Sequence, residues 1–239
     1  MMHVNEYSEK DDSMQIVSII TQYYPSFFKA LGITLQMTVI SLLCATVLGV
    51  IFGLFKVSDF KVLKLIADVY IDIIRGTPLL VQVMIMMYGV GSVLKPYGFQ
   101  WSNIGGAFTA GCVALSLNAG AYMAEIIRGG IEAVDKGQME AARSLGLSYG
   151  KAMRKVILPQ AFRTMLPSII NQFIISLKGT SLEAANAPKK MTQNGKIIAA
   201  NSASMVMPIW ICVALFYLVV CTILSRIAKY VERRVSYGK

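Results

Sequence analysis

The stretch Glu140-Ala141-Ala142-Arg143-Ser144-Leu145-Gly146 is followed by a basic run that ends in Val156-Ile157-Leu158-Pro159. These residues form a polar, helix-favouring island in a chain with 55% hydrophobic residues, 15% charged residues and a mean hydropathy of +0.58. A soluble domain of 239 residues does not carry so few charges. The bilayer is therefore the expected solvent for most of the chain, and residues 140–159 are expected to lie outside it.

Apolar runs without charges indicate several membrane-spanning helices. A helix needs about 20 apolar residues to cross about 30 Å of hydrocarbon, and four runs meet or approach that length. A fifth run is shorter but continues through a polar end. We predict an all-α integral membrane protein with five transmembrane helices, at residues 30–55, 64–94, 96–124, 164–177 and 197–225.

The distribution of Lys and Arg indicates the orientation. With the N-terminus outside, the cytoplasmic segments hold fifteen of the 23 basic residues and the outer segments hold seven, while Arg75 lies inside a span. Cytoplasmic loops are enriched in positive charge, so an outside N-terminus and a cytoplasmic C-terminus are favoured. We divide the chain into an N-terminal tail with an interfacial lead-in helix at 1–29, a membrane domain at 30–235 and a cytoplasmic tail at 236–239. Within the membrane domain, a cytoplasmic loop at 129–160 joins the third and fourth predicted helices.

The first residues are not expected to form a secretory signal. Four acidic side chains precede the first apolar residues, and no basic segment or small-residue cleavage site is present. Residues 13–28 carry apolar side chains at mixed helical spacing, which is typical of a helix at the membrane interface. A partly ordered tail is the alternative.

The sequence lacks the residue sets of common enzyme and metal sites. Its one histidine is His3, its four cysteines lie apart within the predicted spans, and no Gly-x-x-x-x-Gly-Lys-Ser/Thr run occurs. We therefore expect no catalytic residue, no metal site, no cofactor and no ATP hydrolysis on this chain. The formal net charge of +10 is interpreted as a topology signal rather than as a sign of nucleic-acid binding.

Small and hydroxylated residues recur along one face of the first predicted span. Such a face lets another helix approach closely and hydrogen-bond. We interpret it as a packing surface. It comprises Thr34, Thr38, Ser41, Ala45, Gly49 and Gly53.

The second predicted span contains a charge and a helix breaker. Arg75 is expected near the middle of the bilayer, where a charge costs about 2.5–3.5 kcal/mol on insertion scales, and Gly76-Thr77-Pro78 follows. Pro78 cannot donate a hydrogen bond to the Ile74 carbonyl, so we expect a kink or break. Broken helices with a charge at mid-depth build solute sites in transporters. A structural Asp72–Arg75 ion pair beside a kink is the alternative.

Polar side chains also mark the third span and the end of the fourth. Asn118, Tyr122 and Glu125 share one helix face; they either line a pathway or join helices, and joining is favoured for Glu125. The fourth span becomes more polar toward Lys178, whose simpler interpretation is a side chain that reaches for the outer interface. The predicted substrate pathway comprises Arg75, Thr77, Asn118, Tyr122, Lys178, Thr180 and Ser181.

The polar loop is expected to form a bent helix pair. Lys136 to Leu145 favours a helix that Gly146 ends in the left-handed conformation. Ser148 is placed to cap a second helix from Tyr149 to Leu158, which Pro159 is expected to end. We predict a docking surface for a soluble partner, with surface decoration as the alternative. Residues expected to be available for contact include Ala141, Ala142 and Leu145.

The same loop resembles that of the permease subunits of ABC importers. The family reads Glu-Ala-Ala, three residues, Gly, nine residues and Ile-x-Leu-Pro; here Val156 replaces Ile and the other positions match. The run from Arg75 to Gln82 and the run Asp135-Lys136-Gly137-Gln138 further resemble the polar amino-acid uptake branch, and the likeness covers roughly residues 25–235. It implies that the residues coupling the chain to an ATPase are Glu140, Ala141, Ala142, Gly146, Leu147 and Tyr149.

The resemblance implies a function and a set of partners. The chain would be a multi-pass permease subunit of an ATP-driven importer that moves an amino acid across the cytoplasmic membrane of a prokaryote. Its partners would be two ATP-binding subunits that carry ATP and Mg, a second permease that is identical or paralogous, an extracytoplasmic solute-binding protein and membrane lipid. A secondary transporter or a non-transporting membrane scaffold subunit is the alternative.

One segment departs from the pattern of the branch. Where the branch reads Lys-Asp-Thr-Ser-Leu, this chain has Lys178-Gly179-Thr180-Ser181-Leu182. The missing carboxylate leaves Lys178 without its expected neighbour. We hypothesise that the added positive charge shifts preference away from cationic amino acids and toward neutral or anionic ones.

Overall fold

The computed structural model describes residues 3–180, 191–201 and 206–236, and all regular elements in these ranges are helices or helical turns. The predicted all-α class is therefore confirmed for this part of the chain. Four stretches are long and apolar enough to cross a membrane, and the helix at residues 158–179 is not among them, so the predicted count of five spans and the predicted orientation stay predictions. The four are Ser18–Lys56, Leu79–Tyr97, Gly106–Glu132 and Val206–Ile227.

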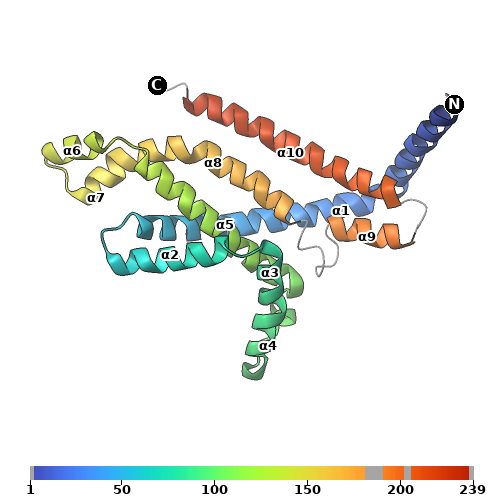
Figure 1. Cartoon of the computed structure of the whole chain (residues 1–239), viewed down its shortest axis with the longest axis horizontal. Coiled ribbons are helices and arrows are strands. Elements are labelled where there is room, and N and C mark those ends of the chain that lie inside the picture. The colour runs from blue at the N-terminus through green and yellow to red at the C-terminus, as the bar shows by residue number, and fades with distance from the viewer. Residues whose placement is uncertain (1–2, 181–190, 202–205, 237–239) are drawn as a thin grey trace.

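Most helices run roughly along the long axis of the molecule (Figure 1). At one end lies a hairpin made of α6 (Lys136–Ser144) and α7 (Tyr149–Ala152), and toward the other end lies the N-terminal part of α1 (His3–Lys56). The last helix, α10 (Val206–Ser236), ends on the side of the hairpin. The two ends of the described chain thus point toward opposite ends of the molecule.

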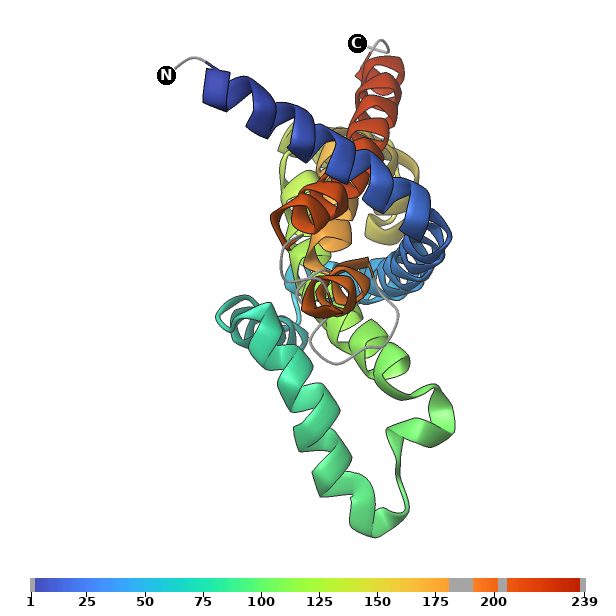
Figure 2. The same ribbon diagram turned by 90° about the vertical axis from the view of Figure 1, so that its right-hand side faces the viewer.

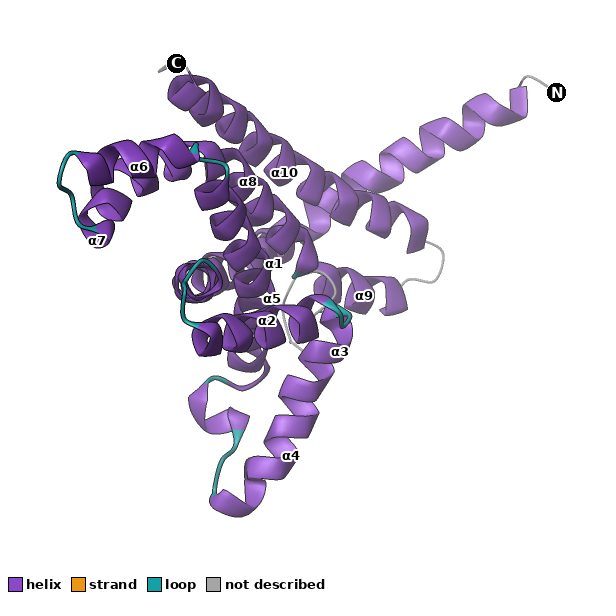
Figure 3. Ribbon diagram, turned by 60° about the vertical axis from the view of Figure 1, so that its left-hand side comes forward, coloured by secondary structure: helices purple, strands orange, loops and turns teal. Residues whose placement is uncertain are grey.

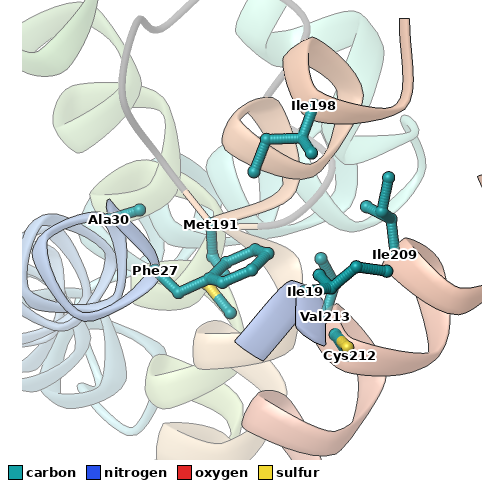
Figure 4. Packing of buried hydrophobic residues seen from close by; sticks show 8 residues of the cluster. All are labelled: Ile19, Phe27, Ala30, Met191, Ile198, Ile209, Cys212 and Val213. Atoms are coloured by element: carbon teal, nitrogen blue, oxygen red, sulfur yellow. The ribbon is translucent and has the colours of Figure 1, made fainter. Parts of the chain in front are cut away.

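The first helix runs without interruption across the predicted boundary at residue 29. It is one helix of 54 residues with Pro25 inside it, so the predicted lead-in helix and first span form one element. A proline there removes one backbone hydrogen bond, while the neighbouring Phe27 and Ala30 are fully buried. They pack against α9 (Met191–Asn201) and α10 in an apolar cluster (Figure 4). This burial favours continuation of the helix.

The predicted small-residue face of α1 packs on α5 (Gly106–Glu132), as expected. A Cβ atom added at Gly49 would lie 2.5 Å from the Cβ atom of Met123, so the two helices approach within the space that a glycine leaves. Ser41 Oγ donates a hydrogen bond to the Cys112 carbonyl across the same interface at 3.3 Å. The interpretation of this face as a packing surface is confirmed.

The second predicted span is broken, as expected from Pro78. Its first part is α2 (Lys61–Arg75), and its second part begins with α3 (Leu79–Met84). A π-helical turn η1 (Ile85–Val90) and α4 (Gly91–Leu94) continue α3 away from the other helices (Figures 2 and 3). The second predicted span is therefore two helices with different directions.

The third predicted span begins later than residue 96. The 3₁₀ turns η2 (Lys95–Tyr97) and η3 (Trp101–Ile104) precede α5. Gly98 and Gly105 follow these turns with φ of 82° and 101°, a conformation that ends helical runs and that glycine adopts most easily. The fifth predicted span also starts later, because residues 197–201 belong to α9.

Pro159 does not end a helix, contrary to the prediction. From α7 the chain passes through a π-helical turn η4 (Met153–Ile157) directly into α8 (Leu158–Gly179). Pro159 then occupies the start of α8, where the wider π turn before it accommodates the ring and its missing N–H costs little. Ser148 holds the cap position of α7, but its side chain makes no capping hydrogen bond.

Candidate functional site

The break between α2 and α3 frees a backbone acceptor that a side chain then binds. Pro78 has no N–H, so the Ile74 carbonyl lacks its usual helical donor. Gln82 Nε2 lies 2.6 Å from that oxygen, 3.0 Å from the Thr77 carbonyl oxygen and 2.8 Å from Thr77 Oγ1. The side-chain amide has two N–H groups to share among these acceptors. Gln82 therefore replaces the hydrogen bonding that the proline removes.

The same glutamine joins the break to α5. Its Oε1 accepts a hydrogen bond from Asn118 Nδ2 at 2.9 Å. Gln82 was absent from the predicted pathway, although the run from Arg75 to Gln82 marked the family resemblance. A signal for it existed, because Gln82 is an amide in the first turn of the helix that follows Pro78. Side chains on a helix tilt toward its N-terminus, so this amide can reach back to the break.

A cavity of about 710 Å³ opens beside the break. Its walls come from the end of α2, the start of α3, the middle of α5 and the last two turns of α8. Cavities that bind small molecules usually measure about 300–1,000 Å³. The size therefore suits a small solute. The lining residues are Arg75, Gly76, Thr77, Pro78, Leu79, Leu115, Asn118, Ala119, Tyr122, Gln172, Ile175, Ser176, Lys178 and Gly179.

Arg75 faces α5 at the wall of this cavity. Its guanidinium lies 5.3 Å from the centroid of the Tyr122 ring and 3.9 Å from a Glu125 carboxylate oxygen, and its side chain is 44% exposed. Among the described residues Arg75 forms no ion pair with Asp72, so that alternative is wrong. The ring face and the carboxylate on α5 attract the guanidinium toward the cavity, away from the flank of α2 that carries Asp72.

Glu125 is the centre of an ion-pair network that joins three helices. Lys56 Nζ lies 2.8 Å from Glu125 Oε1 and 3.0 Å from Asp68 Oδ1, and Arg128 Nη2 lies 2.8 Å from Glu125 Oε2. These contacts connect the end of α1 with α2 and α5. A carboxylate that is only 17% exposed needs such partners to offset its lost hydration. The predicted role of Glu125 in joining helices is confirmed.

The structure brings five of the seven predicted pathway residues to the cavity wall. Thr180 lies behind that wall, because its side chain is buried and its hydroxyl donates to the Leu177 carbonyl at 2.5 Å. Ser181 lies outside the described residues. The five lining residues are Arg75, Thr77, Asn118, Tyr122 and Lys178.

The α6–α7 hairpin has the predicted turn at Gly146. The Asp135 side chain caps α6 by accepting a hydrogen bond from the Gly137 N–H at 2.6 Å. Gly146 has φ of 84°, and the next N–H, from Leu147, donates back to the Ala142 carbonyl at 3.2 Å. This pattern satisfies carbonyls at the end of the helix. The predicted left-handed cap is confirmed.

The exposed side chains of the hairpin differ from the expected contact set. Glu140, Ala141 and Tyr149 are exposed and Leu147 is half-buried, but Ala142 is buried inside the hairpin with 4% exposure. Ala142 is therefore not available for a partner, contrary to the prediction. Leu145, which was predicted to be available for contact although the coupling set omitted it, is 85% exposed at the turn. This apolar side chain is available for contact with a partner.

The base of the hairpin is anchored in the membrane helices. Buried Ile127 and Ile131 of α5 pack with Ile157 of η4 and with Ala161 and Met165 of α8. Protein interiors of this kind transmit displacement because they are close-packed. A force on the hairpin would therefore reach α5 and α8, two of the four helices that form the cavity wall.

Comparison with protein-family models matches residues 45–237 to the binding-protein-dependent transport system inner membrane component family. The arginine transport system permease protein ArtQ of Bacillus subtilis is 39% identical over 212 residues, which cover 89% of this chain and 93% of the relative. The glutamine transport system permease protein GlnP of Escherichia coli is 38% identical over 220 residues, covering 92% and 97%. The L-cystine transport system permease protein TcyB of Bacillus subtilis is 34% identical over 217 residues, covering 90% and 88%.

Two solved structures have a similar fold. A crystal structure of an amino acid ABC transporter with histidines superposes with a TM-score of 0.81 at 39% identity, covering 90% of this chain and 96% of that one. An inward-facing structure of the methionine ABC transporter MetNI superposes with a TM-score of 0.75 at 17% identity, covering 90% and 98%, and shows the fold alone.

Proposed function

Because the chain belongs to the binding-protein-dependent transport system inner membrane component family and is the permease component of an amino-acid ABC importer, we propose that the amino acid crosses it through the cavity beside the break. The observation that carries this proposal is the helix break itself. It places Arg75 and a set of hydrogen-bonding side chains on the wall of a cavity of suitable size. A transported amino acid needs such groups for its charged and polar atoms.

The charges on the wall favour the carboxylate of an amino acid. The described lining residues include two cations, Arg75 and Lys178, and no carboxylate. Opposite unit charges 4 Å apart attract by about 1 kcal/mol in water and about 4 kcal/mol at the effective dielectric of a protein surface. Asn118 and Gln172 add amide groups beside them. We assign the carboxylate of the solute to Arg75 and Lys178.

The same charges disfavour a cationic side chain. Gly179 stands where the family branch has an aspartate, so position 179 contributes no carboxylate to the lining. Relatives at similar identity are named for arginine, glutamine and cystine, so their names alone do not select a substrate. We therefore propose a neutral or anionic amino acid as the substrate of this chain.

Competition for uptake tests this specificity. The permease is reconstituted with its ATPase and its binding protein, and unlabelled arginine, glutamine, cystine and glutamate compete with a labelled substrate. We expect glutamine, cystine or glutamate to compete best. Arginine as the strongest competitor would overturn the proposed substrate class without affecting the importer function.

ATP hydrolysis is assigned to partner subunits that dock on the α6–α7 hairpin. We propose two ATP-binding subunits that carry ATP and Mg, a second permease, an extracytoplasmic binding protein and a prokaryotic cytoplasmic membrane as the setting. Exposed Leu145 and Tyr149 at the turn support a docking surface, and the anchored base supports transmission toward the cavity. Purification of the chain from its native membrane, followed by quantification of copurified ATP-binding subunits, tests this assembly. A purified chain that transports without an ATPase would contradict it.

A further inference from the structure

The Arg75 guanidinium is oriented by two contacts that leave its hydrogen-bond donors open. It lies 5.3 Å from the centroid of the Tyr122 ring, and its Nη1 lies 3.9 Å from Glu125 Oε2. A hydrogen bond between a guanidinium and a carboxylate needs about 2.7–2.9 Å, so the contact with Glu125 is an ion pair without a hydrogen bond. Within the described part of the chain no acceptor is hydrogen-bonded to Arg75. Its N–H groups, which form a planar fork, are therefore open to a solute in the cavity.

Glu125 is held by two other cations. Arg128 donates to Glu125 Oε2 from Nε at 3.1 Å and from Nη2 at 2.8 Å, and Lys56 Nζ lies 2.8 Å from Glu125 Oε1. Attraction between charges falls with distance. The shorter contacts with Arg128 and Lys56 therefore outweigh the longer contact with Arg75.

Lys56 and Arg128 are themselves anchored to further carboxylates. Lys56 Nζ lies 3.0 Å from Asp68 Oδ1 of α2, and Arg128 Nη1 pairs with Glu132, one turn later on α5. Each cation thus joins Glu125 to a second carboxylate. The Glu125 carboxylate is restrained from two sides, because Lys56 comes from the end of α1 and Arg128 from the next turn of α5.

The backbone around these ion pairs is closely packed. A Cβ atom added at Gly53 of α1 would lie 3.0 Å from the Ala124 carbonyl oxygen of α5. The Tyr70 hydroxyl of α2 donates to the Leu117 carbonyl of α5 at 2.6 Å. Close packing of this kind keeps helices at a fixed spacing. A change in the ion pairs is therefore a movement of side chains rather than of helices.

A small movement would close the pair between Glu125 and Arg75. Their separation of 3.9 Å exceeds a charge-assisted hydrogen bond by about 1 Å. Without the Arg128 charge, Glu125 Oε2 would lose its two nearest donors, and Arg75 would be the cation beside it. A carboxylate with little exposure takes such a partner to offset its lost hydration. The Arg75 guanidinium would then be occupied before an amino acid reached it.

We propose that Lys56 and Arg128 are positioning residues for transport: they hold the Glu125 carboxylate out of hydrogen-bonding range of Arg75. Glu125 then orients the guanidinium without using its donors, and the fork of N–H groups stays open to the carboxylate of the amino acid. The inference rests on the proposed assignment of that carboxylate to Arg75. Lys56 and Arg128 do not line the cavity, and they act only through Glu125.

The test measures occupation of the cavity in the complete reconstituted complex. Ile175 lines the cavity, so Ile175→Cys in a Cys44→Ser background reports an amino acid there through slower reaction with a thiol reagent. Glutamine and glutamate are the probes, one neutral and one anionic. The measured quantity is the concentration of each probe that halves the modification rate. Thermal unfolding of each purified complex records whether the variant is folded.

We expect Arg128→Gln to raise this concentration about tenfold, which is the lower end of what a charge-assisted hydrogen bond contributes. Lys56→Gln frees the other carboxylate oxygen and should change the concentration in the same direction. It takes the place of Arg128→Gln if that complex does not assemble. Arg163→Gln, at an exposed arginine of α8, is the matched control and should leave the concentration unchanged.

Rescue by a second substitution is the decisive readout. Glu125→Gln removes the competing carboxylate, so adding Arg128→Gln to it should change the concentration by less than about threefold. A merely structural role of Arg128 predicts the opposite, because the double variant lacks more of the ion pairs than either single variant. An unchanged concentration for Arg128→Gln, or a double variant that binds no better than Arg128→Gln alone, would overturn the inference.

Arg75→Gln separates this inference from the proposed route. Loss of protection in Arg75→Gln together with an unchanged concentration in Arg128→Gln would leave the route standing and reject the positioning role. Unchanged protection in Arg75→Gln, or no protection by either probe in the complex that carries only Ile175→Cys and Cys44→Ser, would reject the proposed route itself.

Discussion

Replacing Gln82 by methionine tests whether its hydrogen bonds stabilise the break between α2 and α3. Methionine has nearly the same length and flexibility but neither donates to the Ile74 and Thr77 carbonyls nor accepts from Asn118. The break itself remains, because Pro78 is unchanged. The variant therefore removes only the side chain that satisfies the freed carbonyl and connects it to α5.

The expected effect follows from the number of hydrogen bonds lost. Each bond contributes about 0.5–1.5 kcal/mol net. The amide has two N–H groups and accepts one bond, and Thr77 is exposed enough for water to replace part of the loss. We take about 2 kcal/mol for the Gln82 hydrogen bonds together. This free energy corresponds to about a 30-fold smaller population of the arrangement of α2, α3 and α5 in the structure.

The assay is ATP-dependent uptake of the labelled amino acid by proteoliposomes that hold the complete complex. We expect the initial rate for Gln82→Met to fall by between about 10-fold and 30-fold. Gln100→Met is the matched control, because Gln100 is exposed between the turns η2 and η3 and far from the break in sequence. Thermal unfolding of each complex shows whether the loss reflects folding.

Wild-type uptake by Gln82→Met would refute this reasoning, because the freed Ile74 carbonyl would then need no partner. A double-mutant cycle with Asn118→Leu gives a second check. If Gln82 and Asn118 act as one bridge, removing both costs no more than removing either. Losses that simply add would show that the two side chains act separately.

Three further substitutions test the packing, the hairpin and the specificity. Gly49→Ala should lower the stability of the purified complex by about 1–3 kcal/mol, because its Cβ atom would overlap Met123. Gly32→Ala on the same helix is the control, because a Cβ atom there meets nothing. Equal thermal stability of the two variants would contradict the close approach of α1 and α5. Gly146→Val should reduce substrate-stimulated ATPase activity, because a β-branched residue at φ of 84° is strained by about 1–3 kcal/mol. Gly146→Asn should retain most of the ATPase activity, because asparagine tolerates this conformation. Full activity of the valine variant would argue against coupling through this turn. Gly179→Asp should raise competition by arginine for uptake several-fold, and Gly179→Asn should not. Equal competition by arginine in the two variants would contradict the proposed effect of charge at position 179.

The sequence predicted features that depend on single residues or short repeats. Pro78 predicts the helix break, because it follows Gly76 and Thr77 and its ring disfavours helical geometry at the residue before it. Gly146 predicts the turn of the hairpin, and the glycine repeat in α1 predicts a close helix contact, for the same local reason. All three are present in the structure.

The contacts of individual side chains were less predictable, because they depend on which helices become neighbours. A pair between Arg75 and Asp72 on α2 was the alternative to a pathway role, but α5 brings the Tyr122 ring and Glu125 to Arg75. Ala142 carries part of the family motif, yet it is buried, and its burial depends on how α6 packs against neighbouring elements. Spacing along one helix does not contain this information.

Helix boundaries were misplaced where a breaker had two possible effects. Pro159 ends a helix in most contexts, but here the π turn before it makes it the start of α8. Pro25 lies inside α1 because the residues after it are buried against α9 and α10. In both cases tertiary packing decides how the chain accommodates the ring.

Occupation of the cavity by the amino acid during transport is the most direct test of the central claim. Ile175 lines the cavity and is 53% exposed, so a cysteine at this position, in a Cys44→Ser background that removes the exposed native thiol, reports access to it. The complete complex is treated with a small thiol reagent during ATP turnover, with and without the transported amino acid. The account predicts that the amino acid slows modification of Ile175→Cys several-fold but does not slow modification of Phe60→Cys, an exposed position between α1 and α2 outside the cavity and the candidate spans. Equal modification of Ile175→Cys with and without the amino acid would contradict it.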